Sequence, residues 1–135
     1  MSAINWVDGD GVFEDAPLLL MDRVRNMAGA YPTQASITSI KYKVFACEDE
    51  DAVIAANGEI VGTETTCVIA DVLYDTLQTD SRWTKDTTGY NLAIELPPGS
   101  RPAGGWHRIE AVITPVTGSP YPVVWGVRTL AMAGS

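Results

Sequence analysis

The residue types that could perform catalysis in this chain are one histidine, His107, and two cysteines, Cys47 and Cys67. A hydrolase needs an activated nucleophile beside a base that a third group orients. His107 lies in a run typical of a strand and belongs to no recognisable motif, so we interpret it as an ordinary strand residue. We predict that the chain is not an enzyme. Its many carboxylates leave a small glycosidase as the enzymatic alternative, because that chemistry depends on separations that a sequence does not show.

The sequence also lacks the usual patterns of metal-binding and phosphate-binding sites. One histidine and two distant cysteines fall short of the ligand set of a structural zinc site. The run Asp8–Gly11, with Glu14 and Asp15, carries hard oxygens suited to calcium, but it lacks the full loop pattern with its terminal bidentate glutamate. Neither Gly9–Gly11 nor Gly104–Gly105 has the spacing of a phosphate cradle. We predict no metal, no cofactor and a solvated turn at Asp8–Gly11.

The charge balance is acidic, with 9 lysine and arginine residues against 17 aspartate and glutamate residues and a formal net charge of -8. The basic residues are scattered along the chain, whereas a surface that follows phosphates needs clustered lysine and arginine. The sequence therefore predicts that nucleic acid is not a partner.

The segment from Met1 to Trp6 has no basic stretch followed by an apolar run, which a secretory signal requires. The longest apolar stretch, Ala16–Met21, is far shorter than the roughly twenty residues that span a bilayer. We predict synthesis in the host cytoplasm without a signal peptide, and no membrane partner. In that compartment Cys47 and Cys67 are expected to be free, with a disulfide as the alternative.

Large aromatic residues and one acidic run are the candidates for an interface. Trp6 and Phe13 precede the clear strands, where a large apolar side chain gains little unless a neighbour covers it. Trp83 lies in a polar segment, where it either closes one end of the fold or contacts a partner. The acidic run indicates a hairpin tip in water or a contact with a basic partner. Its four residues are Glu48, Asp49, Glu50 and Asp51.

Alternation of apolar and polar residues predicts strands over most of the chain. The expected strands cover residues 17–25, 36–47, 65–69, 90–96, 106–113 and 121–128. Asn57-Gly58 suits a two-residue turn and predicts a hairpin between 52–55 and 59–61. Trp125 alternates with Val123 and Val127 and is expected in the core.

One short helix is expected near residues 71–78, where apolar residues change to a helical spacing and Asp71 could cap the first turn. No linker divides the chain, and its length fits one domain. We predict an N-terminal arm or irregular lead-in over residues 1–16 and a single domain over 17–135. About seven short strands with turn signals between them predict an all-β, immunoglobulin-like β-sandwich.

The middle of the chain carries an unusual string, which runs Val72-Leu73-Tyr74-Asp75-Thr76-Leu77-Gln78-Thr79-Asp80-Ser81-Arg82-Trp83, then Asp86, then Gly89-Tyr90-Asn91-Leu92. With Ala35–Val44 and Gly105–Arg128, it resembles small Ig-like structural proteins of tailed phages and prophages, of the head-decoration or baseplate type. The resemblance covers roughly residues 17–128 and carries no catalytic residue.

This resemblance implies a virion protein, most readily a capsid decoration or stabilising protein that acts through protein–protein contacts. Its expected partners are a major capsid or tail protein and copies of itself. A tail or baseplate component is one alternative. A host-carbohydrate-binding module that uses exposed tryptophans for stacking is the other.

Overall fold

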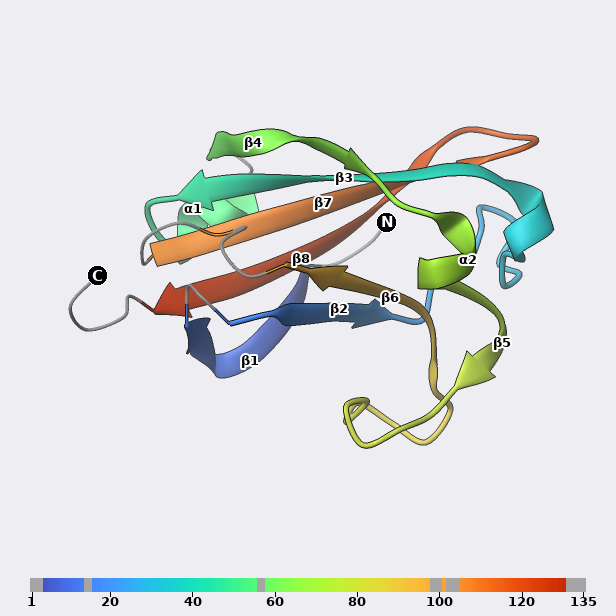
Figure 1. The fold of residues 1–135 in the computed structure, drawn as a ribbon, viewed down its shortest axis with the longest axis horizontal. Coiled ribbons are helices and arrows are strands. Elements are labelled where there is room, and N and C mark those ends of the chain that lie inside the picture. The colour runs from blue at the N-terminus through green and yellow to red at the C-terminus, as the bar shows by residue number, and fades with distance from the viewer. Residues whose placement is uncertain (1–3, 14–15, 56–57, 98–100, 102–104, 131–135) are drawn as a thin grey trace.

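A computed structural model describes residues 4–13, 16–55, 58–97, 101 and 105–130. Strands dominate this part of the chain, which confirms the all-β prediction. The strands are β1 (Ile4–Phe13), β2 (Leu18–Asp22), β3 (Ile37–Cys47), β4 (Glu59–Thr66), β5 (Leu73–Gln78), β6 (Tyr90–Leu96), β7 (Gly105–Pro115) and β8 (Tyr121–Leu130) (Figure 1). The helical segments are η1 (Gln34–Ser36), α1 (Glu50–Ala55) and α2 (Ile69–Val72).

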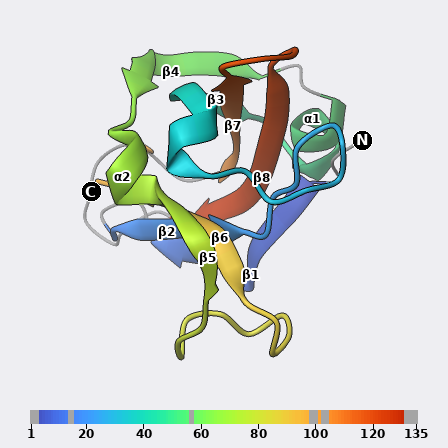
Figure 2. The same ribbon diagram turned by 90° about the vertical axis from the view of Figure 1, so that its right-hand side faces the viewer.

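The strands form two sheets that lie one above the other (Figures 1 and 2). The larger sheet has five strands in the order β1-β8-β7-β3-β4, and the smaller has three in the order β2-β6-β5. Neighbouring strands are antiparallel except β1, which runs parallel to β8. The two predicted strands over 59–61 and 65–69 belong largely to one strand, β4, which forms an edge of the larger sheet.

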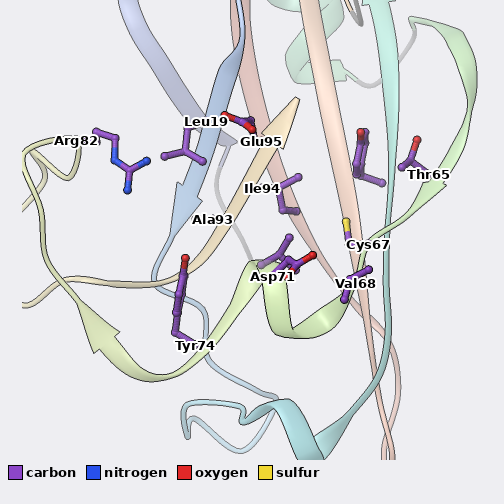
Figure 3. Close-up of a pocket in the computed structure, with 12 residues that line it drawn as sticks. Leu19, Thr65, Cys67, Val68, Asp71, Tyr74, Arg82, Ala93, Ile94 and Glu95 are labelled. Carbon is purple, nitrogen blue, oxygen red and sulfur yellow. The ribbon is translucent and has the colours of Figure 1, made fainter. Parts of the chain in front are cut away.

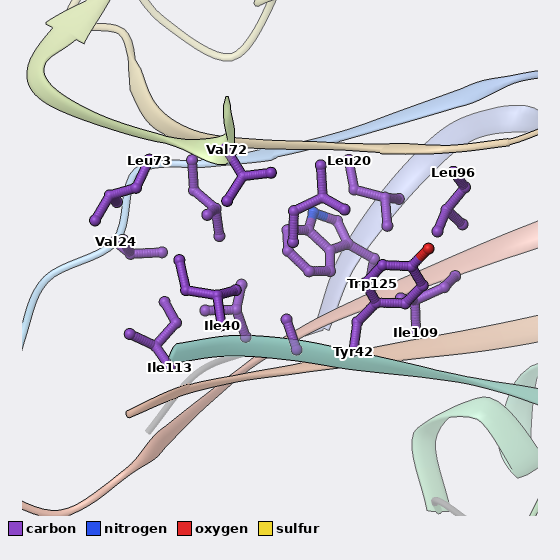
Figure 4. Packing of buried hydrophobic residues seen from close by; sticks show 14 of the residues in the cluster. Leu20, Val24, Ile40, Tyr42, Val72, Leu73, Leu96, Ile109, Ile113 and Trp125 are labelled. Atoms are coloured by element: carbon purple, nitrogen blue, oxygen red, sulfur yellow. The ribbon is translucent and has the colours of Figure 1, made fainter. Parts of the chain in front are cut away.

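The core lies between the sheets, because alternate residues of each strand point inward. The inward side chains of β7 and β8 are Ile109, Ala111, Ile113, Val123, Trp125 and Val127, and they share one cluster with Leu18, Leu20, Leu92, Ile94 and Leu96 (Figure 4). Trp125 is 1% exposed, as predicted, and its indole Nε1 donates a hydrogen bond to the carbonyl oxygen of Met21, 3.1 Å away on β2. This bond joins the two sheets through the middle of the core.

The prediction of an arm or irregular lead-in is wrong for residues 4–13. These residues form β1, which pairs with β8 from Ile4 opposite Val124 to Phe13 opposite Leu130. Val7 and Val12 pack against the core. The turn-rich run near Gly11 obscured this strand in the sequence, because it produces an irregularity between Val7 and Val12 rather than an end of pairing. The rest of the predicted arm, 1–3 and 14–15, lies outside the described residues.

The helix predicted near 71–78 is also wrong over most of its length. The helical turn is α2, which ends at Val72, and Leu73–Gln78 is β5. Leu73 pairs with Leu92 and Gln78 with Tyr90, with an irregularity between the two pairs. Hydrogen bonding to β6 therefore decides the backbone here, and the irregularity explains why the apolar spacing imitated a helix.

The predicted hairpin around Asn57-Gly58 does not form as expected, because residues 50–55 are the helix α1 rather than a strand. Asn57 lies outside the described residues. Asp49 begins this helix, since its carboxylate Oδ1 accepts the backbone N–H of Ala52 at 2.8 Å. Within the described residues, no helix is both long and apolar enough to cross a bilayer.

Candidate functional site

His107 lies inside the core rather than at a reactive surface. It is 1% exposed, and its Nδ1 is 2.8 Å from the hydroxyl of Thr129. The guanidinium of Arg101 donates to the same hydroxyl, at 3.3 Å, and to the carbonyl oxygen of Ala16, at 2.7 Å. Burial, reinforced by the charge of Arg101, lowers the pKa of His107 to about 4. The imidazole is therefore neutral at physiological pH and sits beside a buried cation.

The sheet geometry separates His107 from the nearer thiol. Cys47 is opposite Trp106 in the β3–β7 pair, and His107 follows Trp106 on the strand. Because successive side chains alternate between faces, Cys47 and Trp106 share one face and His107 points to the other. Both cysteines are free, and burial raises the pKa of each thiol, so both stay protonated at neutral pH.

Metal-ligating residues do not gather in the described part of the chain, which contains no group of three or more histidine, cysteine, aspartate or glutamate residues suited to an ion. The carboxylates of the calcium candidate belong to Asp8, Asp10, Glu14 and Asp15, and their side chains lie outside the described part of the structure.

The string that carries the phage resemblance runs from the end of α2 through β5 and a loop to the start of β6 (Figure 2). We call this loop, residues 79–89, the clamp loop. Asp86 is its main acceptor. Its carboxylate accepts hydrogen bonds from the indole of Trp83 at 2.9 Å, from the backbone N–H of Thr88 and Gly89 at 3.0 and 3.1 Å, and from Arg23 at 2.8 Å. The Trp83 bond is the main reason that the pKa of Asp86 is held well below its usual range.

Two further aspartates of the string accept hydrogen bonds from other residues of the chain. Asp80 accepts hydrogen bonds from Arg82 at 2.6 Å and from the hydroxyl of Tyr90 at 2.8 Å, and these bonds lower its pKa. Asp75 accepts the backbone N–H of Gln34 at 2.7 Å. The aspartates of the string therefore make intramolecular contacts.

Trp83, predicted either to plug one end of the sandwich or to contact a partner, packs instead against the outer face of the smaller sheet. It is 9% exposed and belongs to a small second cluster with Tyr90 and Ala93 on the smaller sheet. Tyr74, Leu19 and Met21 pack against this cluster. The clamp loop thus covers the outside of the smaller sheet, and Trp83 is buried by its own chain.

Trp6 and Phe13 remain exposed, at 42% and 50%. The ring of Trp6 meets Trp106 edge-on, with ring centroids 5.7 Å apart. It also lies over Gly126, because a Cβ placed on Gly126 would be 2.9 Å from that ring. Gly126 stands between the inward residues Trp125 and Val127, so Trp6 covers the outer face of the larger sheet, which is the face turned away from the core.

The acidic run is the start of α1 and not a hairpin tip. Asp49 caps the helix, and Glu50 and Asp51 occupy its first turn, where the positive end of the helix dipole favours carboxylates. All four acidic side chains are exposed. At the other end, Arg108 donates to the carbonyl oxygens of Val53 and Ile54, which fixes α1 on the outer face.

The outer face of the larger sheet also exposes apolar side chains. Ile54 on α1 is 55% exposed, Ile60 on β4 is 56% exposed and Val112 on β7 is 39% exposed. Val112 alternates with inward residues, and Ile60 lies opposite Phe45, whose other partner is Arg108. With Trp6, these side chains are the exposed large apolar residues of this face, which also carries the ion pair of Arg108 with Glu110.

The described surface also contains recesses. An end pocket of about 480 Å³ lies between the connection from β2 to β3 and the turn from β7 to β8. Tyr121 lines it, and the buried Tyr121 hydroxyl has no hydrogen-bond partner in the described structure. A second recess of about 410 Å³, which we call the edge groove, lies between Ala93–Glu95 of β6 and Thr65–Val68 (Figure 3).

Comparisons with protein-family models, with curated proteins and with solved structures found no match to this chain.

Proposed function

We propose that this chain is a structural protein of a tailed-phage particle, of the capsid-decoration type, which binds other virion proteins through its surface. The observation that carries the proposal is the contrast between its polar and apolar groups. The polar side chains of the resembling string are largely engaged within the chain, whereas Trp6, Ile54, Ile60 and Val112 stay exposed on one face. Such a surface suits protein contacts rather than chemistry.

We also infer that the domain is an Ig-like module. The smaller sheet, β2-β6-β5, corresponds to the B, E and D strands of such a fold. In the larger sheet, β8-β7-β3-β4 corresponds to the G, F and C strands with an added C′ strand. The chain departs from antibody domains in that Cys47 and Cys67 are free and no disulfide joins the sheets.

The direct test is to purify the particle made by the source genome and to locate this chain in it by mass spectrometry and imaging. We expect many copies at one symmetric position on the head, where repetition allows weak contacts to act together. A position on the tail would make the chain a tail or baseplate component. Its absence from purified particles would refute the proposal.

A host-carbohydrate-binding module is the second candidate, and the half-exposed ring of Trp6 favours it. However, Trp106 meets this ring edge-on at 5.7 Å, so only part of it is open for stacking. A glycan array separates the two functions, because a carbohydrate-binding module would retain selected sugars and lose them in Trp6→Ala. Quenching of tryptophan fluorescence by the same sugars provides a second readout.

A further inference from the structure

The end pocket is formed by three segments at one end of the sandwich. They are the connection from β2 to β3, the helical turn η1 and the turn from β7 to β8 (Figure 1). Its buried lining residues include Ile37 and Tyr121, at 5% and 7% exposed, and its exposed lining residues include Met27 and Val116, at 80% and 65%. The volume of about 480 Å³ is within the usual range of small-molecule sites. The pocket is therefore open to solvent and has a buried floor.

Hydrogen bonds hold the walls of this pocket in place. The backbone N–H of Val116 donates to the carbonyl oxygen of Ser36 at 2.9 Å, which ties the turn from β7 to β8 to η1. In the connection from β2 to β3, the side-chain oxygen of Asn26 accepts the backbone N–H groups of Ala28 and Ala30, each at 3.0 Å. Because these walls are already braced, a ligand would not have to order them on binding.

One buried polar group of the pocket lacks a partner. Tyr121 lines the pocket, and its hydroxyl has no hydrogen-bond partner among the described residues. Buried hydroxyls are almost always paired, because burial without a partner costs free energy. Burial also raises the pKa of Tyr121, so the phenol is protonated at neutral pH and can donate a hydrogen bond. Because this hydroxyl is buried, the group that pairs with it must enter the bottom of the pocket.

The chemistry of the lining defines the class of ligand. None of the described residues that line the pocket is charged, although the chain carries a net charge of -8. A charged ligand would lose its water there without gaining an opposite charge. Apolar side chains make up much of the lining, and they include Met27, Pro32, Ile37, Pro115 and Val116. We propose that the end pocket binds a small uncharged molecule with an apolar body and one hydroxyl or carbonyl oxygen, which accepts a hydrogen bond from Tyr121.

The first test measures binding and its position in the intact chain. The probe is para-ethylphenol, which is uncharged at neutral pH, titrated into isotopically labelled protein and followed by amide chemical shifts. We expect the shifts to concentrate at Ala28, Ser36 and Val116–Ser119, which line the pocket. The anion para-ethylbenzoate should bind about tenfold more weakly or worse, because no cation awaits it. Absence of para-ethylphenol binding, shifts elsewhere on the chain, or equal affinity for the two probes would overturn the proposal.

Tyr121→Phe separates binding from folding. The variant removes only a hydroxyl that lacks a partner, so the free protein should be as stable in urea as the unmodified chain, or more stable. Its affinity for para-ethylphenol should nevertheless fall about fivefold, because the hydrogen bond to the ligand is lost. A hydroxyl with a merely structural role would change stability and not affinity. Unchanged affinity would overturn the assigned hydrogen bond, whatever the stability.

A matched pair of variants tests the pocket itself. Ala28 and Ala30 are exposed residues of the same turn, and of the two only Ala28 lines the pocket. Ala28→Phe should obstruct the pocket and weaken binding about tenfold or more, whereas Ala30→Phe should leave the affinity nearly unchanged. Equal affinity in the two variants would refute the pocket as the site. These experiments use the isolated chain, so their failure leaves its location in a particle untouched, and its absence from particles leaves them untouched.

Discussion

The indole nitrogen of Trp83 donates a hydrogen bond to the carboxylate of Asp86, 2.9 Å away. The same oxygen accepts the backbone N–H groups of Thr88 and Gly89, so one carboxylate ties the side chain that covers the smaller sheet to the turn that leads into β6. Arg23, just after β2, binds Asp86 from the other side at 2.8 Å. This bond pattern gives a structural meaning to an otherwise unexplained motif.

Replacing Asp86 should loosen the clamp loop. Asp86→Ala removes the common acceptor of Trp83, Thr88 and Gly89, so the loop should open more often and expose Arg82 and Lys85 to trypsin. The measurement is the rate of tryptic cleavage within residues 79–89 under native conditions. Thr87→Ala in the same loop is the control and should cleave like the unmodified chain. Equal rates for Asp86→Ala and the control would contradict the assigned role.

Gly89 should be intolerant of any side chain. Its φ is +107°, and a Cβ there would collide with the carbonyl oxygen of Gln78. Gly29 has a similar φ of +86° but open space around it, so it isolates the conformational cost. We expect Gly29→Ala to lower the free energy of unfolding by about 1 kcal/mol and Gly89→Ala by more than about 2 kcal/mol. Urea denaturation measures both, and equal losses would show that the collision with Gln78 is relieved.

The buried histidine should make the protein sensitive to mild acid. The pKa of His107 falls from 6.5 to about 4 on folding, so the unfolded chain takes up a proton first as the pH drops. The free energy of unfolding is therefore unaffected by this histidine above pH 6.5. It decreases as the pH falls from 6.5 to about 4, and the total decrease due to His107 is at most about 3 kcal/mol. Asp80 and Asp86 stay ionised in this window because their pKa values are lowered. Burial raises the pKa of Asp22, so the folded chain binds a proton at Asp22 more readily than the unfolded chain does. Protonation of Asp22 therefore favours the folded state as the pH falls, opposite to the effect of His107.

Chemical denaturation across that pH range checks the assignment, with His107→Gln as the comparison. The variant does not titrate at this position, so its stability should change less between neutral pH and pH 4 than that of the unmodified chain. Parallel curves for the two proteins would mean that His107 is not the source of the acid sensitivity.

Substitution of Trp83 should mainly lower stability, whereas substitution of Trp6 should mainly weaken binding to the particle. Trp83→Ala removes a side chain that is 9% exposed and should cost about 3 kcal/mol. Trp6→Ala removes one that is 42% exposed and should cost only about 1 kcal/mol, while it removes apolar area from the outer face. In a particle-binding assay, folded Trp6→Ala should attach less than the unmodified chain. Full attachment of Trp6→Ala would exclude Trp6 from the interface.

The sequence alone determined the fold class and most of the inward side chains. Alternation places Trp125 and the apolar residues of β6 and β7 in the core, because a half-buried strand must show period two whatever it pairs with. It did not predict the roles of Asp75, Asp80 and Asp86. Their partners lie on other elements or depend on the turn geometry of the loop, and spacing carries no record of either.

Only the tertiary structure decided the elements whose local pattern was ambiguous. Residues 4–13 become a strand because β8 offers a parallel edge, and residues 73–78 become one because β6 pairs with them at two points. The fate of Trp6 and Trp83 was open for the same reason. Each is a large ring whose burial depends on which distant segment folds over it. Such contacts between distant segments are a property of the folded chain, and a local pattern of residues cannot contain them.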